Sequence, residues 1–165
     1  MSTPSGVFET LVGSLDYPMF VVTAADGDRR AGCLVGFATQ CSIDPPRILV
    51  CLSKQNHTTT VARRARSLVV HVLRASDRDL AARFGAETGD EVEKFAGVGL
   101  ATAPGGAPAI TTLDWFEGVV TARHDLGDHV GYVLAVDDSA GSADRSHEPQ
   151  LGFAQVRDLE PGHPV

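Results

Sequence analysis

The chain contains little cysteine, and the cysteines that it has form no recognisable pattern. Cys33, Cys41 and Cys51 are an odd number, lie in apolar strand-like segments, and show neither a Cys-x-x-Cys pair nor the Cys/His spacing of a metal site. The six histidines are scattered along the sequence. We therefore expect reduced structural thiols and no bound metal, with a redox dithiol or a metal site as the alternative.

Long apolar runs and an excess of positive charge are also missing. No stretch approaches the roughly 18 apolar residues of a membrane span, and the N-terminus has no basic region followed by an apolar core. The 21 acidic and 14 basic residues give a formal charge of −7, whereas nucleic acids and anionic membranes require a positive surface. These absences predict a soluble, cytoplasmic protein that binds neither. The local cluster Arg63, Arg64 and Arg66 is expected to form the solvated face of a helix, with a contribution to the positive potential around an anion site as the alternative.

The length of 165 residues suits one domain, which we place over residues 1–165. Apolar runs and period-two alternation predict seven strands, at 17–24, 31–41, 47–52, 68–73, 114–124, 128–136 and 150–156. Short helices are expected at 58–65, 76–84 and 90–95, with Thr58, Ser76 and Thr88 as their N-caps. Surface loops are expected at 104–108 and 137–149. This order predicts a mainly β protein, an antiparallel barrel with short capping helices.

The junction between the third strand and the first helix has the residues of an anion site. After the apolar run, the segment from Ser53 to His57 cannot extend the strand, and the first turn of the helix would point unpaired amides outward. These amides and the helix dipole favour a phosphate, and Lys54 adds a mobile positive charge. An ordinary capped helix with a solvated loop is the alternative interpretation.

Four segments in a fixed order then resemble a known family. They are GCLVGFATQCSIDPP at 32–46, RILVCLSKQNHTTT at 47–60, the stretch from Phe84-Gly85 through TGDEVEKF at 88–95, and Gly127-Asp128-His129. Together they cover most of the chain. The sequence resembles the NAD(P)H-dependent flavin reductase family with the FMN-binding split-barrel fold, especially its flavoredoxin-like branch.

The resemblance implies a split β-barrel that binds FMN, with FAD or a deazaflavin as alternatives, and that uses NAD(P)H as co-substrate. It also implies a homodimer with the flavin near the interface, where the helix at 90–95 would supply an amphipathic surface. The acceptor of the electrons would be free flavin, a partner monooxygenase or another molecule.

The resemblance also assigns site residues. Those against the isoalloxazine and ribityl chain are Leu34, Val35, Gly36, Phe37, Thr39, Gln40 and Ser42. Those at the phosphate are Ser53, Lys54, Asn56, His57 and Thr58. Those reaching the flavin across the dimer are Phe84, Gly85, Thr88 and Gly89. Many relatives have Thr, Ser or Asn at positions 34, 36 and 37, so we expect backbone rather than side-chain hydrogen bonds there. Without the resemblance, the first group reads as a buried strand with a bulge, and the last as residues that end one helix and begin another.

His129 is the predicted catalytic residue, because the resemblance places it near the flavin and the nicotinamide. It would orient NAD(P)H or stabilise the reduced flavin anion; the alternative is a histidine that only belongs to a turn. The sequence contains no G-x-G-x-x-G after a strand, so NAD(P)H use rests on the resemblance. The predicted function is an NAD(P)H-dependent flavin reductase. The alternative is an electron carrier or flavin-binding protein that retains FMN without oxidising NAD(P)H.

Overall fold

The computed structural model describes residues 6–86 and 93–159 of the chain. Its strands are β1 (Phe20–Asp26), β2 (Arg29–Val35), β3 (Ala38–Ser42), β4 (Arg47–Ser53), β5 (Ser67–Val72), β6 (Leu100–Thr102), β7 (Pro108–Ile110), β8 (Asp114–Asp125) and β9 (His129–Ser142). Its helices are α1 (Val7–Gly13), α2 (His57–Ala62) and α3 (Arg78–Ala86), with single 3₁₀ turns η1 (Ala75–Asp77) and η2 (Phe153–Gln155).

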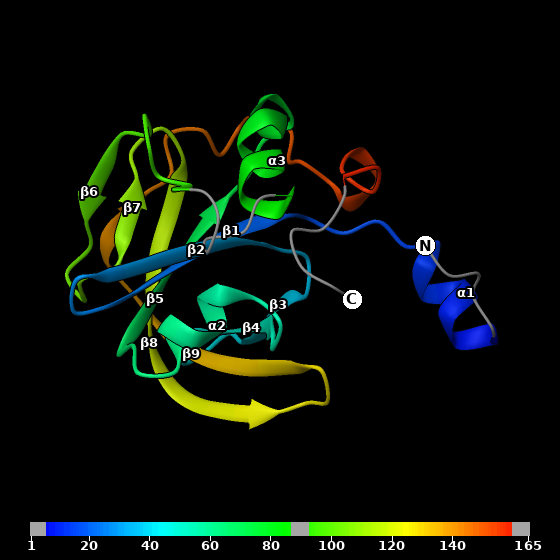
Figure 1. Cartoon of the computed structure of the whole chain (residues 1–165), viewed down its shortest axis with the longest axis horizontal. Coiled ribbons are helices and arrows are strands. Elements are labelled where there is room, and N and C mark those ends of the chain that lie inside the picture. Colours follow the sequence, from blue (N-terminus) through cyan, green and yellow to red (C-terminus); the bar gives the residue numbers. More distant parts are fainter. Residues whose placement is uncertain (1–5, 87–92, 160–165) are drawn as a thin grey trace.

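Seven strands form one antiparallel sheet in the order β2-β1-β5-β8-β9-β4-β3. β2 and β3 are therefore the two edges of this sheet, although only Gly36 and Phe37 separate them in the chain. Such a short link between opposite edges requires the sheet to curl on itself, as Figure 1 shows. No ladder joins β2 to β3 in the described residues, so the barrel is open along this line. The prediction of a mainly β, antiparallel fold with short helices is confirmed.

β1 is apolar along most of its length because both of its faces are buried. Val22 and Ala24 belong to the core enclosed by the curled sheet and α2. Val21 on the opposite face packs in a second core with Leu73 and Phe84, beneath α3 and the C-terminal segment. Two cores thus meet at β1, and the C-terminal segment is held against the side of the barrel that β2 borders.

A buried histidine joins the sheet to the β6–β7 hairpin. His71 Nδ1 lies 2.9 Å from the Val21 carbonyl oxygen, and the Ile110 backbone N–H donates to His71 Nε2 at 2.9 Å. The ring must therefore be neutral, with its proton on Nδ1. Burial lowers the pKa of His71 to about 4, which keeps this arrangement intact at neutral pH.

Several boundaries differ from the sequence prediction near the first sheet edge. The strand expected at 31–41 is interrupted at Gly36-Phe37, which yields β2 and β3. The strand expected at 17–24 begins only at Phe20.

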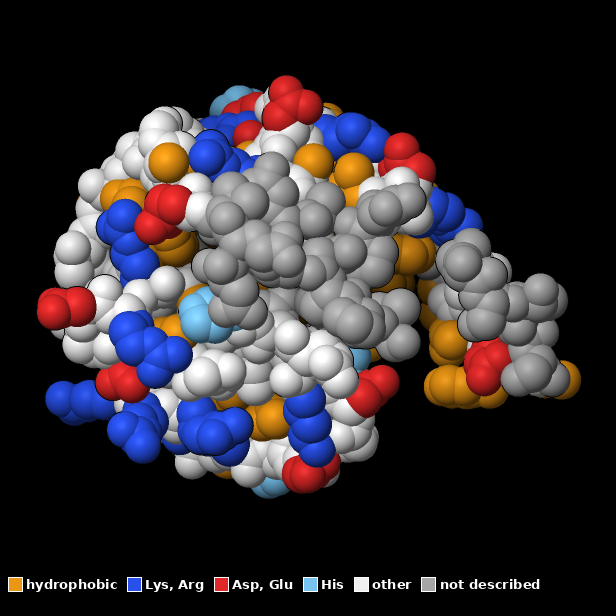
Figure 2. Space-filling model, in the orientation of Figure 1, with side chains coloured by type: hydrophobic (Ala, Val, Ile, Leu, Met, Phe, Trp, Pro, Cys, Tyr) orange, Lys and Arg blue, Asp and Glu red, His pale blue; other side chains and the backbone are white. Residues whose placement is uncertain are grey.

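The N-cap of α2 is Asn56 rather than Thr58, because the Asn56 side chain accepts from the Thr58 N–H at 2.9 Å. α2 ends at Ala62, so the exposed arginines at 63, 64 and 66 follow the helix instead of forming its face. Figure 2 shows basic side chains gathered below α2.

Other differences arise from pairing between distant segments. The loop expected at 137–149 is strand as far as Ser142, because β9 continues to pair with β8 up to Trp115. The strand expected at 150–156 consists of two isolated bridges followed by η2. The loop at 104–108 is present, but it is flanked by β6 and β7, which the sequence did not reveal. Ser76 lies inside η1 rather than capping a helix.

The helix expected at 90–95 and its cap Thr88 fall largely in residues 87–92, outside the described part of the chain. Its last residue, Phe95, lies in a turn and is buried, with its ring edge-on to Phe84 at 5.5 Å between centroids. Phe95 therefore does not contribute to an exposed amphipathic surface.

α1 stands apart from the barrel (Figure 1), and none of its residues is buried. Its apolar side chains face solvent: Val7 is 77% exposed, Phe8 75% and Leu11 61%. Figure 2 shows hydrophobic side chains on the projecting segment. No helix of residues 6–86 and 93–159 is long and apolar enough to cross a membrane.

Candidate active site

A pocket of about 420 Å³ opens where the β2–β3 junction, the end of β4 and the C-terminal segment meet. This volume lies in the range of small-molecule sites, and the lining is mainly apolar with a few polar groups. Residues Leu34 to Phe37 form one side, and Ser53 at the end of β4 and Asn56 after it form another. The C-terminal wall consists of Phe153, Val156, Arg157 and Leu159. The opening of the barrel and the pocket therefore coincide.

The edge of β2 offers unpaired backbone groups to this pocket. Lys94 Nζ donates to the Gly32 carbonyl at 3.2 Å, so the backbone groups of Gly32 point away from β1. The direction of the backbone groups alternates from one residue to the next along a strand, so residues two apart point the same way. The N–H and C=O of Leu34 therefore also point away from β1. β2 pairs only with β1 in the described residues, and Leu34 lines the pocket. A flat ligand with hydrogen-bonding edges can therefore pair with the backbone there, as β-edge recognition requires.

Two glycines line the pocket at positions where a neighbouring side chain approaches the backbone closely. A Cβ at Gly36 would overlap the Tyr17 ring, and a Cβ at Gly85 would lie 2.7 Å from Leu34 Cδ2. Both glycines line the pocket. Gly36 therefore permits the close approach of Tyr17 to the strand end.

The loop after β4, which is the predicted anion site, has other backbone hydrogen bonds than those expected. Its amides are satisfied internally: the Thr58 N–H donates to Asn56 Oδ1 at 2.9 Å, and the Lys54 N–H donates to the Asp128 carbonyl at 2.9 Å. The Thr58 side chain is buried, and Lys54 Nζ pairs with Asp125 Oδ1 at 2.8 Å. The expectation that the first helical turn presents unpaired amides is therefore wrong for Thr58, whose N–H is already bound by the Asn56 side chain.

The groups at this loop that remain for a phosphate are side chains. Ser53 and Asn56 line the pocket, and Lys54 is exposed in an ion pair that solvent screens. Its hydrogen bond lowers the pKa of Asp125. An exposed ion pair is easily exchanged, so Lys54 can leave Asp125 for a bound phosphate.

His129 begins β9 at the lower end of the pocket. Its Nδ1 lies 2.7 Å from Asp128 Oδ1, and this hydrogen bond lowers the pKa of the Asp128 carboxyl group. The imidazole ring lies 5.1 Å from the Phe37 ring between centroids. Asp128 thereby fixes the orientation of the ring and leaves Nε2 as the nitrogen available to a ligand.

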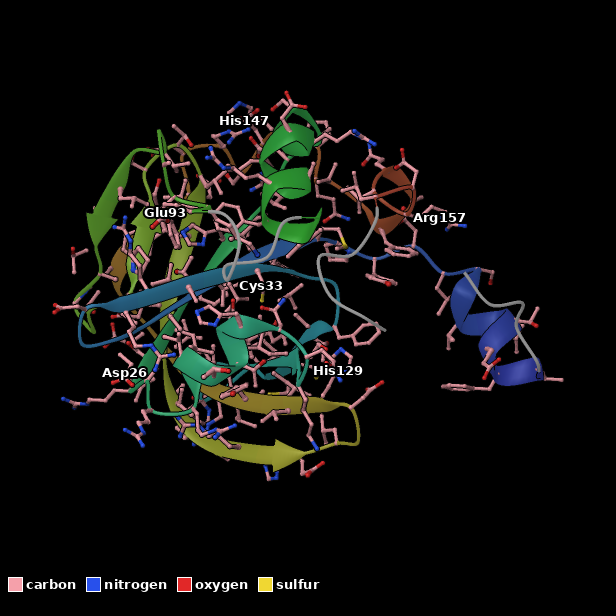
Figure 3. The ribbon with its side chains drawn as sticks, in the orientation of Figure 1. Asp26, Cys33, Glu93, His129, His147 and Arg157 are labelled. Atoms are coloured by element: carbon pink, nitrogen blue, oxygen red, sulfur yellow. The ribbon has the colours of Figure 1, made fainter. Side chains whose placement is uncertain are left out.

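The aromatic groups of the pocket form a continuous row. Phe37 lies 6.2 Å from Tyr17, and Tyr17 stacks on Phe153 at 4.8 Å with an interplanar angle of 12°. Arg157 then lies over the Phe153 ring, 5.3 Å from its centroid. Figure 3 places His129 near the ends of β3 and β4 and Arg157 beside η2. The row therefore runs from the histidine to the arginine.

Only some of the site residues predicted from the sequence line the pocket. Those that line it are Leu34, Val35, Gly36, Phe37, Ser53, Asn56, Gly85 and His129. Those described elsewhere are Thr39, Gln40, Ser42, Lys54, His57, Thr58 and Phe84, the last buried beneath the pocket. Thr88 and Gly89 lie outside the described residues. Lining residues that the sequence did not reveal as site residues are Tyr17, Met19, Cys33, Cys51, Leu52, Gln55, Asp128, Phe153, Val156, Arg157 and Leu159.

The two pocket cysteines are in their protonated form at neutral pH. Burial raises the pKa of Cys33 to about 11, against the smaller opposing effects of the Thr58 hydroxyl and Lys94. Burial also raises the pKa of Cys51. The thiolate is the nucleophilic form, so neither residue is activated for thiol chemistry. No group of three or more His, Cys, Asp or Glu side chains in the described ranges has the geometry of a metal site.

Comparison with known proteins agrees with this architecture. The flavin reductase like domain family matches residues 12–159. A high molecular weight rubredoxin from Moorella thermoacetica is 33% identical over 130 residues, a match that covers 77% of this chain and 57% of that protein. The reductase subunit HsaB of a flavin-dependent monooxygenase from Rhodococcus jostii is 30% identical over 164 residues, covering 96% of this chain and 80% of that protein.

Among solved structures, the NADH:FAD oxidoreductase SgcE6 of Streptomyces globisporus superposes with a TM-score of 0.78 at 20% identity, covering 93% of this chain and 92% of the other. This likeness shows a shared fold. The chain belongs to the flavin reductase like domain family. The family prediction and the prediction of an oxidoreductase of the flavin reductase type are confirmed.

Proposed function

We propose that this protein binds FMN in the pocket between the β2–β3 junction, the end of β4 and the C-terminal segment, and that it reduces the FMN with a hydride from NADH or NADPH. The observation that carries the proposal is the unpaired backbone edge at Leu34, which borders an apolar pocket and ends near Ser53 and Asn56. An isoalloxazine needs such an apolar slot with hydrogen-bonding groups along one edge, and a ribityl phosphate needs polar groups at one end. The residues present fit both requirements.

In this arrangement the chain binds and orients, and the flavin supplies the redox chemistry when bound. The backbone of Leu34 and Gly36 would hold the pyrimidine edge. Lys54, Ser53 and Asn56 would hold the phosphate. His129, oriented by Asp128, would place a hydrogen bond near the reacting rings and support the negative charge that develops on the flavin.

We also propose a homodimer. α1 exposes Val7, Phe8 and Leu11 and contacts no core of its own chain, which is costly for a helix in water unless a partner covers it. Phe37, which lines the pocket, and Leu126 are each 55% exposed and add apolar surface. Light scattering should give twice the 17.4 kDa chain mass. A monomer with full flavin occupancy would contradict the proposal.

For the acceptor of the electrons we favour free flavin or a partner monooxygenase, since the relative from Rhodococcus jostii is named as a monooxygenase reductase subunit. The rubredoxin relative from Moorella thermoacetica supports a second candidate, an electron carrier that retains its flavin. This chain spans 57% of that protein, so the rest of that relative has no counterpart in the match.

The visible spectrum of the purified protein distinguishes these functions. A flavin band that bleaches when NADH or NADPH is added without oxygen supports the reductase. A band that persists with both donors but bleaches with dithionite supports the carrier. A protein that binds no added FMN would contradict both.

A further inference from the structure

Arg157 is the only lysine or arginine that lines the pocket in the described residues. Its guanidinium contacts the Phe153 ring, and no carboxylate of residues 6–86 and 93–159 forms an ion pair with it. Nearby cations differ in this respect. Lys54 is paired with Asp125, and Arg78 binds both carboxylate oxygens of Asp158.

The segment that carries Arg157 is firmly attached to the barrel. The Phe153 N–H donates to the Tyr17 carbonyl at 2.8 Å, and the Leu151 N–H donates to the Leu73 carbonyl at 2.9 Å. The Arg78–Asp158 contact holds the following turn to α3. Arg157 is thus exposed on a segment that is hydrogen-bonded to the barrel. Its guanidinium lies over an aromatic ring, and this cation–π contact leaves its charge unneutralised.

We propose that Arg157 binds a phosphate group of the nicotinamide dinucleotide, at the end of the pocket away from His129. The inference rests on the proposed reductase function, because it assigns the position of that reaction's electron donor. The rings of Phe37, Tyr17 and Phe153 lie between the two ends, and Phe37, which is 55% exposed, offers a face on which a flat ring of the dinucleotide would stack.

Charge and position favour the dinucleotide over the flavin phosphate as the ligand of Arg157. The flavin phosphate already has Lys54, Ser53 and Asn56 at the end of β4. A dinucleotide carries two further phosphates, and a planar guanidinium binds a phosphate with two parallel hydrogen bonds. In a chain of formal charge −7, an unpaired arginine at the pocket mouth also supplies local attraction for an anionic donor.

The test compares donors with and without phosphates. Arg157→Gln should raise KM for NADH by about tenfold or more, the effect of losing a charge-assisted contact. The same variant should leave the rate with 1-benzyl-1,4-dihydronicotinamide unchanged, because that donor has no phosphate. Arg157→Lys should recover part of the loss. Arg64→Gln, which removes an exposed arginine outside the pocket, is the matched control and should change neither donor.

A binding measurement separates this inference from the proposed function. Calorimetric titration of the FMN-loaded protein with ADP-ribose should show weaker binding in Arg157→Gln than in the wild type. Equal binding, or equal losses with both hydride donors, would overturn the role of Arg157. A reduced preference for FMN over riboflavin would also overturn it, since Arg157 would then hold the flavin phosphate. If wild-type protein oxidises neither donor, the reductase function fails, while ADP-ribose binding still decides the role of Arg157.

Discussion

Lys54 gives the sharpest prediction about the flavin phosphate, because its ion pair can be exchanged. Its side chain is 41% exposed and pairs directly with Asp125, which is 74% exposed, so leaving that partner costs little in a solvent-screened pair. A charged hydrogen bond to phosphate contributes about 1.5–3 kcal/mol, and about 1.4 kcal/mol corresponds to a tenfold change in affinity. Lys54→Ala should therefore weaken FMN binding about tenfold or more.

Asp125→Asn should have the opposite effect. It removes the competing carboxylate and a negative charge near the phosphate position, so FMN binding should strengthen a few-fold. This increase should shrink as salt is added, because screening weakens both effects. Asn56 is a poorer position for this test, since Asn56→Ala also removes the cap of α2, at a cost of about 1 kcal/mol in stability.

The assay is quenching of flavin fluorescence on titration with FMN and, in parallel, riboflavin. Riboflavin lacks the phosphate, so its affinity should be nearly the same in the wild type, Lys54→Ala and Asp125→Asn. Arg64→Ala serves as the control for loss of an exposed cation elsewhere. If Lys54→Ala lowers both affinities equally, or neither, the phosphate does not bind beside Lys54.

Other expected outcomes follow from the same contacts. His129→Ala should bind FMN normally but slow its reduction by NADH about a hundredfold in stopped-flow experiments, and an unchanged rate would leave His129 as a turn residue. Gly36→Ala should weaken FMN and riboflavin binding alike, because the new methyl group overlaps the Tyr17 ring and forces this pocket-lining side chain to move; calorimetry that finds wild-type affinity would contradict this. Folded variants in which all three cysteines are alanine should keep their turnover, and a loss in an FMN-loaded variant would implicate a thiol. The unfolding free energy should fall by about 3 kcal/mol as pH decreases from 6.5 to 4, since His71 takes up its proton in the unfolded chain first; denaturant titrations of His71→Gln should lack this component.

The sequence predicted the elements whose pattern is local. The apolar run from Arg47 and the alternation after Asp128 correspond to β4 and the first part of β9, because burial on one or both faces leaves a periodic trace. Where pairing with a distant strand decides the structure, as for β9 beyond Val136, the polar sequence gives no indication.

The candidate site divides in the same way. Leu34 to Phe37 and Ser53 were found because they lie in contiguous segments with a recognisable order. Phe153 and Arg157 were missed because they reach the pocket through bonds to Tyr17 and Arg78, far away in the chain. The cap of α2 was misplaced by two residues because Asn56 and Thr58 are both good capping residues, and only the geometry shows which side chain accepts the amide.

The break at Gly36-Phe37 explains why the open line of the barrel and the pocket occur together. If the strand had continued from 31 to 41, the β2 edge would have run on past the pocket, and the chain could not have crossed to the opposite edge of the sheet. Instead two residues carry the chain across, the Phe37 carbonyl accepts the Cys51 N–H at 2.9 Å, and Phe37 comes to rest beside His129. The backbone at Leu34 is left unpaired by the same event.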